Sequence, residues 1–164
     1  MPLTDEERKA IVVYRLEKAE GVFVEAEDCA SMEHWTLAAN RLYYAAYYAS
    51  SALLVSAGLM AKTHEGTIGM IGQHYVRTGV LTKEDGALLA RLQNMRHTGD
   101  YDDFLDWTQE DVEPCFPKVD AYIEKIKSII YYCCPLKVSE QRDIHPQCCC
   151  NGIADDFSEG KPLS

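Results

Sequence analysis

The sequence predicts an all-α protein folded as an up-and-down antiparallel bundle of four to five helices. Three observations lead to this fold class. Apolar residues recur every three or four positions along each long segment, as the buried face of a helix requires. No segment shows the alternating pattern of a half-buried strand. The connections between the periodic segments are short, so neighbouring helices are expected to run antiparallel.

The first two helices are expected before residue 60. Thr4 and Glu7 have the spacing of a capping box, which marks a helix start. The apolar pattern that follows continues to a break near Ser31. The next segment, residues 33–58, is apolar almost all round, which is typical of the central helix of a bundle. Gly58 is expected to end that helix.

The third and fourth helices are expected within residues 63–79 and 82–97. The third has a weaker pattern because it contains several glycines. The fourth begins with Thr82 as the N-cap and Asp85 as the acidic residue three positions later. Gly99 is expected to end or bend this fourth helix.

A last helix is expected within residues 108–132. Pro114 and Pro117 leave its start open, because a helix interior tolerates proline poorly. Beyond this helix the periodicity is lost. The sequence therefore predicts one domain, residues 1–132, followed by a disordered cysteine-containing tail, residues 133–164.

The net charge and the N-terminal residues limit which partners and which cellular location can be expected. The formal net charge is -10, so a nucleic acid would have to meet a local basic patch rather than a basic surface. An acidic surface equally suits a basic protein partner. The first ten residues are polar and no apolar run is long enough to span a membrane, which predicts a cytoplasmic protein without membrane attachment.

Five of the seven cysteines crowd the end of the chain. Without an export signal, a disulfide framework is not expected. Zinc sites prefer cysteines separated by two to four residues, whereas Cys148 to Cys150 are adjacent. No metal or other cofactor is therefore predicted, and reactive thiols on a disordered extension are the preferred interpretation.

Three motifs, in this order, carry a family resemblance: "NRLYYAAYYASSALL", "KTHEGTIG" and "RHTGDYDDF". Together they resemble the small prokaryotic HEPN-domain proteins over residues 5–130. The resemblance implies a helical bundle that forms a homodimer, and a nucleotide or RNA as its ligand. It also implies a partner, a minimal nucleotidyltransferase, in a toxin–antitoxin-like module. Many members of this family are metal-independent ribonucleases.

The ribonuclease pattern of that family is an arginine, a polar residue, three variable positions and a histidine. Here it begins at Arg96, His97 takes the polar position, and Tyr101 stands where the nucleases have histidine. An imidazole exchanges protons near neutral pH, whereas a phenol with an ordinary pKa of about 10 is a poor base. Arg96 can still bind a phosphate through its planar set of donors.

Three further residues are candidates to support Arg96. Asn40 lies on the most apolar helix and needs a hydrogen-bond partner, for which Arg96 and Asp100 are candidates. Tyr44 is expected at the same cleft, while Tyr43, Tyr47 and Tyr48 are expected in the core. The alternative is a buried network that fixes helix register, with a simple ion pair between Arg96 and Asp100.

The start of the third helix offers a second group of candidates. Thr63 is expected as its N-cap, and Lys62 beside an exposed helix N-terminus would suit an anion. His64 could supply the imidazole that position 101 lacks, although a lone histidine is more often a packed or capping residue.

Three functional hypotheses follow. The preferred one is a binding and regulatory module that recognises a nucleotide or RNA phosphate through Arg96. The second is a metal-independent endoribonuclease toxin, in which Arg96 stabilises the transition state and His97, His64 or Tyr101 moves the proton. The third is a purely structural interaction protein, because a fold alone does not assign a function.

Overall fold

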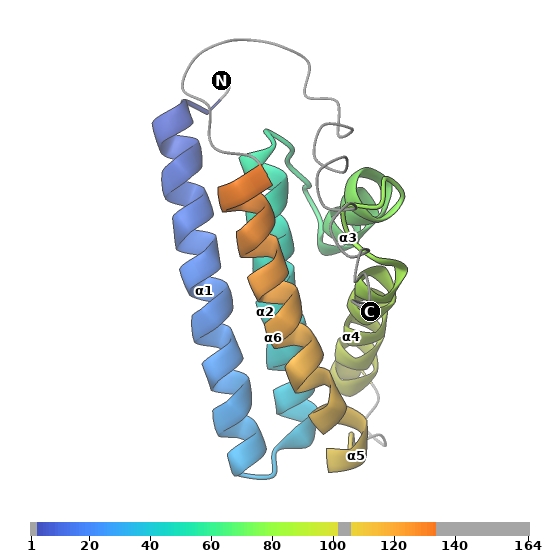
Figure 1. The fold of residues 1–164 in the computed structure, drawn as a ribbon. Helices are drawn as coiled ribbons and strands as arrows, with labels where there is room; N and C mark the ends of the chain where they lie inside the picture. Colours follow the sequence, from blue (N-terminus) through green and yellow to red (C-terminus); the bar gives the residue numbers. More distant parts are fainter. Residues whose placement is uncertain (1–2, 102–105, 134–164) are drawn as a thin grey trace, which may run out of the picture.

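The computed structural model describes residues 3–101 and 106–133, and within these ranges it contains helices and no strand. Figure 1 shows α1, α2 and α6 running side by side, with α3 and α4 on the other side of α2 and α6 from α1. The α-helices are α1 (Asp5–Ser31), α2 (Trp35–Ser56), α3 (His64–Ile71), α4 (Lys83–Tyr101), α5 (Gln109–Val112) and α6 (Phe116–Ser128). The predicted all-α bundle is confirmed.

Helix α2 is the centre of the bundle. It contacts α1, α3, α4, α5 and α6, and buried residues lie on most of its circumference. Many of them are alanines, whose small side chains let neighbouring helices approach closely. Among its buried polar groups, the Ser50 hydroxyl lies 2.7 Å from the hydroxyl of Tyr122 on α6, so neither group is left without a partner.

The predicted helix starts are formed by the expected side chains. Thr4 and Glu7 make the full capping box of α1, with each side chain bonded to the other residue's backbone N–H. Thr82 and Asp85 make the same reciprocal bonds at the start of α4, at 2.8 Å and 3.2 Å. Gly58 follows the end of α2 with a φ of 73°, a conformation that suits glycine.

The predicted helix end at Gly99 is wrong, because α4 runs through this residue to Tyr101. The reason for glycine here is a close contact between helices. A Cβ atom at this position would lie 3.0 Å from Thr36 Cγ2 on α2 and 3.5 Å from the indole nitrogen of Trp107. Gly99 therefore lets α2 and Trp107 approach α4 without interrupting the helix.

Each of the two segments with an uncertain helical pattern consists of more than one helical element. Within residues 63–79, α3 continues into a π-helical turn at Gly72–Val76. Within residues 108–132, α5 leads through a 3₁₀ turn into α6, and both prolines lie at the first or second position of a new helical segment. The tail from residue 134 onward lies outside the described residues, so the domain boundary at residue 132 stays a prediction.

Asp85 links the start of α4 to α6 and makes stability depend on pH. Burial by itself raises the pKa of its carboxyl, but hydrogen bonds from Lys125 and Thr82 and the Lys125 charge together lower it. A lowered pKa means that this contribution to stability is complete above the unfolded-state pKa and is lost as pH falls through the folded-state pKa.

We expect Asp85→Asn to lower the free energy of unfolding by about 1 to 2 kcal/mol at neutral pH, since it removes a charged hydrogen bond. The difference in the free energy of unfolding between wild type and variant should become smaller as the pH falls below about 4. Denaturant unfolding followed by circular dichroism at several pH values measures this difference. A difference that is constant with pH would contradict the assignment.

Candidate functional site

Arg96 projects from α4 toward the tyrosines of α2. Its guanidinium carbon lies 5.6 Å from the ring centres of both Tyr43 and Tyr44. Its Nε lies 3.2 Å from a carboxylate oxygen of Asp100, one helical turn further along α4. The side chain retains a fifth of its accessible surface, so cation–π contacts and an ion pair hold a guanidinium that solvent still reaches.

The Arg96 donors are not used up by these contacts. The Nε is buried and has no hydrogen bond of good geometry, so its contact with Asp100 is an electrostatic one. Within the described ranges, the two terminal nitrogens make no hydrogen bond to the protein. A guanidinium held in place with free donors matches a phosphate, whose oxygens can accept two parallel bonds.

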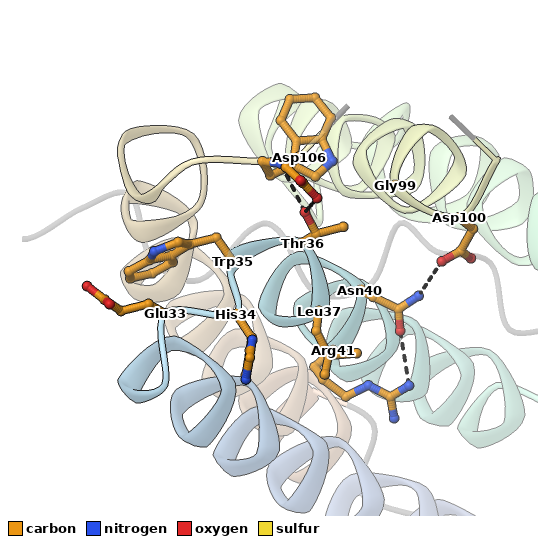
Figure 2. Close-up of a pocket in the computed structure, with 11 residues that line it drawn as sticks. Glu33, His34, Trp35, Thr36, Leu37, Asn40, Arg41, Gly99, Asp100 and Asp106 are labelled. Atoms are coloured by element: carbon orange, nitrogen blue, oxygen red, sulfur yellow. Dashed lines mark hydrogen bonds between the residues drawn. The ribbon is translucent and has the colours of Figure 1, made fainter. Parts of the chain in front are cut away.

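Asn40 connects α2 to the carboxylate that holds Arg96. Its side-chain nitrogen donates to Asp100 at 3.1 Å, and its oxygen accepts from Arg41 at 3.0 Å (Figure 2). Arg41 in turn donates to Glu25 of α1 at 3.3 Å. The predicted partner Asp100 is thus present, and a continuous network runs from α1 through α2 to Arg96 on α4.

Arg41 belongs to this site and was not among the residues predicted from the sequence. Its guanidinium carbon lies 5.6 Å from the Tyr44 ring centre, the same distance as that of Arg96. The sequence contained a signal, because Arg41 precedes Tyr44 by three positions on a helix and residues so spaced are neighbours. Tyr44 thus contacts both arginines, and its predicted place at a binding cleft stays a prediction.

His64 lies in the same aromatic cluster. Its ring stacks on Tyr47 with a centroid distance of 4.1 Å and an angle of 5°, and its Nδ1 lies 3.0 Å from the Tyr43 hydroxyl. Burial and the nearby charge of Arg96 both lower the pKa of this imidazole. The charge of Arg96 therefore acts on the His64 imidazole. Tyr47, on which His64 stacks, is half-buried.

Tyr43 is the buried tyrosine of this aromatic cluster. Burial raises the pKa of its hydroxyl to about 12, although the Arg96 charge acts in the opposite direction. The hydroxyl therefore keeps its proton at neutral pH and can donate to the Nδ1 of a neutral His64. Thr63 holds the backbone of His64 in place, because its side chain accepts the N-cap hydrogen bond of α3 from Gly66.

Three predicted site residues lie outside this cluster. Lys62 is exposed, and within the described part of the chain it makes no hydrogen bond or ion pair. His97 and Tyr101 are also exposed and stack on each other at the end of α4, with ring centroids 5.8 Å apart. Tyr101 is 76% exposed. The described contacts therefore connect Arg96, Asp100 and Asn40 with the α2 tyrosines and His64. Lys62, His97 and Tyr101 are not part of this group.

A match to a known family accompanies this geometry. A family model described as HEPN domain matches residues 12–129 of the chain, well over half of its length. The chain belongs to the HEPN domain family. The family resemblance of the three motifs is thereby confirmed, and the matched span contains α2, α3 and α4, which carry the site.

Several proteins of prokaryotes are similar to this HEPN domain. A protein of Thermotoga maritima named UPF0332 protein is 31% identical over 124 residues, which cover 76% of this chain and 94% of that protein. A protein of Methanocaldococcus jannaschii named "Putative toxin" is 28% identical over 115 residues, which cover 70% of this chain and 78% of that protein. A second protein of that organism with the same kind of name is 29% identical over 93 residues.

The described ranges contain neither a cluster of metal ligands nor a membrane-spanning helix. No group of three or more histidine, cysteine or acidic side chains there could hold a metal ion. No helix there is both long and apolar enough to cross a membrane. The cysteines from Cys134 onward lie outside these ranges.

The contact between Arg96 and His64 predicts a measurable titration. We expect Arg96→Met to raise the pKa of His64, because the substitution removes a positive charge that disfavours the imidazolium while keeping much of the side-chain bulk. His64 should accordingly contribute stability above its unfolded pKa of about 6.5 and lose it as pH falls through the lower folded value. NMR titration of the imidazole C–H signals measures the pKa of His64 in the wild type and in the variant.

Arg91→Ala is the matched control. Arg91 lies on the same helix, but its side chain donates to the backbone oxygen of Asp111, away from the tyrosine cluster. The control should leave the pKa of His64 unchanged. An equal pKa in wild type and Arg96→Met would mean that Arg96 and His64 do not share a site.

Proposed function

We propose that this HEPN domain is a binding and regulatory module that recognises the phosphate of a nucleotide or RNA through Arg96. One observation carries the proposal: the guanidinium is fixed by Asp100 and two tyrosine rings, while its terminal donors have no partner among the described residues. A preorganised, charged donor set of this kind suits a phosphate. Asn40 supports the site by holding Asp100.

The biological setting that we propose is a toxin-like one. It is supported by the names of the Methanocaldococcus jannaschii relatives. In this setting the chain forms a homodimer and acts with a minimal nucleotidyltransferase as its partner protein. Light scattering on the purified chain tests the dimer, and joint purification with a candidate nucleotidyltransferase tests the partner.

A second candidate function is a metal-independent endoribonuclease. The observation that favours it is the place of His64 beside Arg96, since an arginine and an imidazole together provide charge stabilisation and proton transfer. The binding module remains the preferred function, because Tyr101 occupies the position of the family's nuclease histidine and its phenol is a poor base.

We expect AMP, ATP or GTP to raise the melting temperature of the full chain and RNA to remain uncut in the presence of EDTA. A ligand at about 100 times its Kd stabilises a folded protein by roughly 2.7 kcal/mol. Arg96→Ala should abolish the shift because it removes the phosphate donors, whereas Arg91→Ala should keep it. The experiment scores thermal shifts and cleavage of labelled single-stranded RNA for all three proteins.

The other outcomes are equally informative. Cleavage by the wild type that disappears in Arg96→Ala would establish the nuclease and direct attention to His64 as the base. Equal thermal shifts in wild type and Arg96→Ala would place the ligand elsewhere. If no ligand shifts the wild type and Arg96→Ala is only less stable, the network is structural.

A further inference from the structure

The hydroxyl of Tyr43 determines which nitrogen of His64 carries the proton. Tyr43 is 1% exposed, and its hydroxyl has one hydrogen-bond partner among the described residues, the His64 Nδ1 at 3.0 Å. If Nδ1 carried the proton, the buried hydroxyl proton would have no acceptor there, which is unfavourable. The hydroxyl therefore donates to Nδ1, and this nitrogen is the unprotonated one in the neutral imidazole.

The His64 ring is neutral near pH 7 and keeps its one proton on Nε2. Burial and the Arg96 charge both lower the pKa of the imidazole from its ordinary value. Burial also raises the pKa of the Tyr43 hydroxyl to about 12, so this hydroxyl stays protonated and remains a donor. Because Nδ1 is the acceptor, Nε2 is the nitrogen of His64 that can donate a hydrogen bond.

Two tyrosines of α2 hold the His64 ring in one orientation. The ring stacks on Tyr47 with centres 4.1 Å apart, and it meets Tyr44 edge to face with centres 5.7 Å apart. The His64 Nε2 has no hydrogen-bond partner in the described part of the chain, and it is not one of the buried unpaired nitrogens there. Its N–H is therefore an oriented donor that a ligand can reach.

Arg96 and His64 lie against the same pair of tyrosines. The Arg96 guanidinium carbon lies 5.6 Å from the ring centres of Tyr43 and Tyr44, and the His64 ring centre lies 5.9 Å and 5.7 Å from the same two rings. The Arg96 charge also acts on the pKa of His64. Donors from two different helices, α4 and α3, are thereby brought to one place on α2.

The donors at this place outnumber the free oxygens of a phosphodiester. The two terminal nitrogens of Arg96, which have no hydrogen-bond partner in the described ranges, suit two phosphate oxygens side by side. The Nε2–H of His64 adds a third donor without adding charge. A phosphate within an RNA chain has two oxygens that are not esterified, whereas a terminal phosphate has three. The donor set therefore suits a terminal phosphate.

We propose that His64 is a specificity-determining residue of the phosphate site: its Nε2–H donates to the third oxygen of a terminal phosphate monoester, and Tyr43 keeps the proton on that nitrogen. This inference rests on the proposed function, because Arg96 has to bind the phosphate first. It also gives His64 a role other than that of a ribonuclease base. A protonated Nε2 has no lone pair with which to take a proton from a ribose hydroxyl.

The first test reads the tautomer and needs no ligand. In nitrogen–proton NMR spectra of the full chain near neutral pH, we expect an unprotonated Nδ1 and a protonated Nε2 for His64. Tyr43→Phe removes the donor to Nδ1 and should raise the share of the form with a protonated Nδ1. A protonated Nδ1 in the wild type, or the same tautomer population in both proteins, would overturn the proposal.

The second test compares the affinity of the full chain for AMP and for the methyl ester of AMP by calorimetry. His64→Phe keeps an aromatic ring on Tyr47 but removes the donor, so it should bind AMP about tenfold more weakly and the ester with less loss. His64→Gln keeps a donor near the place of Nε2 and should stay within about threefold of wild type for AMP. AMP carries more charge than its ester, so the change between variants is the readout for His64.

His74→Phe is the matched control. It removes an imidazole from the turn that follows α3, and His74 makes no ring contact with the α2 tyrosines in the described ranges. Its affinity for AMP should equal that of the wild type. An equal loss in His74→Phe and His64→Phe would contradict the assignment of His64.

The outcomes separate this inference from the proposed function. Binding of AMP that is lost in Arg96→Ala but unchanged in His64→Phe would contradict the inference alone. The same holds if His64→Phe loses as much affinity for the ester as for AMP, or if His64→Gln is as weak as His64→Phe. No binding of AMP by the wild type would contradict both the inference and the proposed function.

Discussion

The hydrogen bond between Asn40 and Asp100 joins the central helix to the helix that carries Arg96, and the geometry of the site depends on it. Asp100 uses one oxygen for Asn40 and the other for the Arg96 Nε. Arg96 is thereby held over the rings of Tyr43 and Tyr44 instead of extending into solvent. A carboxylate shared in this way limits the freedom of a long side chain, which lowers the entropy that a ligand would have to overcome.

The bundle keeps opposite charges on neighbouring surfaces. Arg96 offers donors to an anion, while Glu33 and Asp106 bring carboxylates to the lining of a pocket beside it (Figure 2). Asp100 belongs to both, since it pairs with Arg96 and lines the pocket. An acidic chain can in this way still provide a local site for a phosphate.

Local interactions were predictable from the sequence, and close approaches between helices were not. The caps at Thr4 and Thr82 follow from residues three positions apart, and the structure contains both. The local pattern at Gly99 predicts a helix end or bend, because its contact with Thr36, distant in the chain, leaves no mark in that pattern. The place of His64 beside Arg96 likewise depends on how α3 packs on the tyrosines of α2.

The central claim is that Arg96 presents free donors to a phosphate. The most direct measurement is NMR of the arginine side-chain signals in the full chain during titration with AMP, with the Arg96 signal assigned by its absence in Arg96→Lys. We predict a saturable shift of the Arg96 signal, while the Arg91 signal stays fixed. An Arg96 signal that does not move while AMP binds would contradict the account.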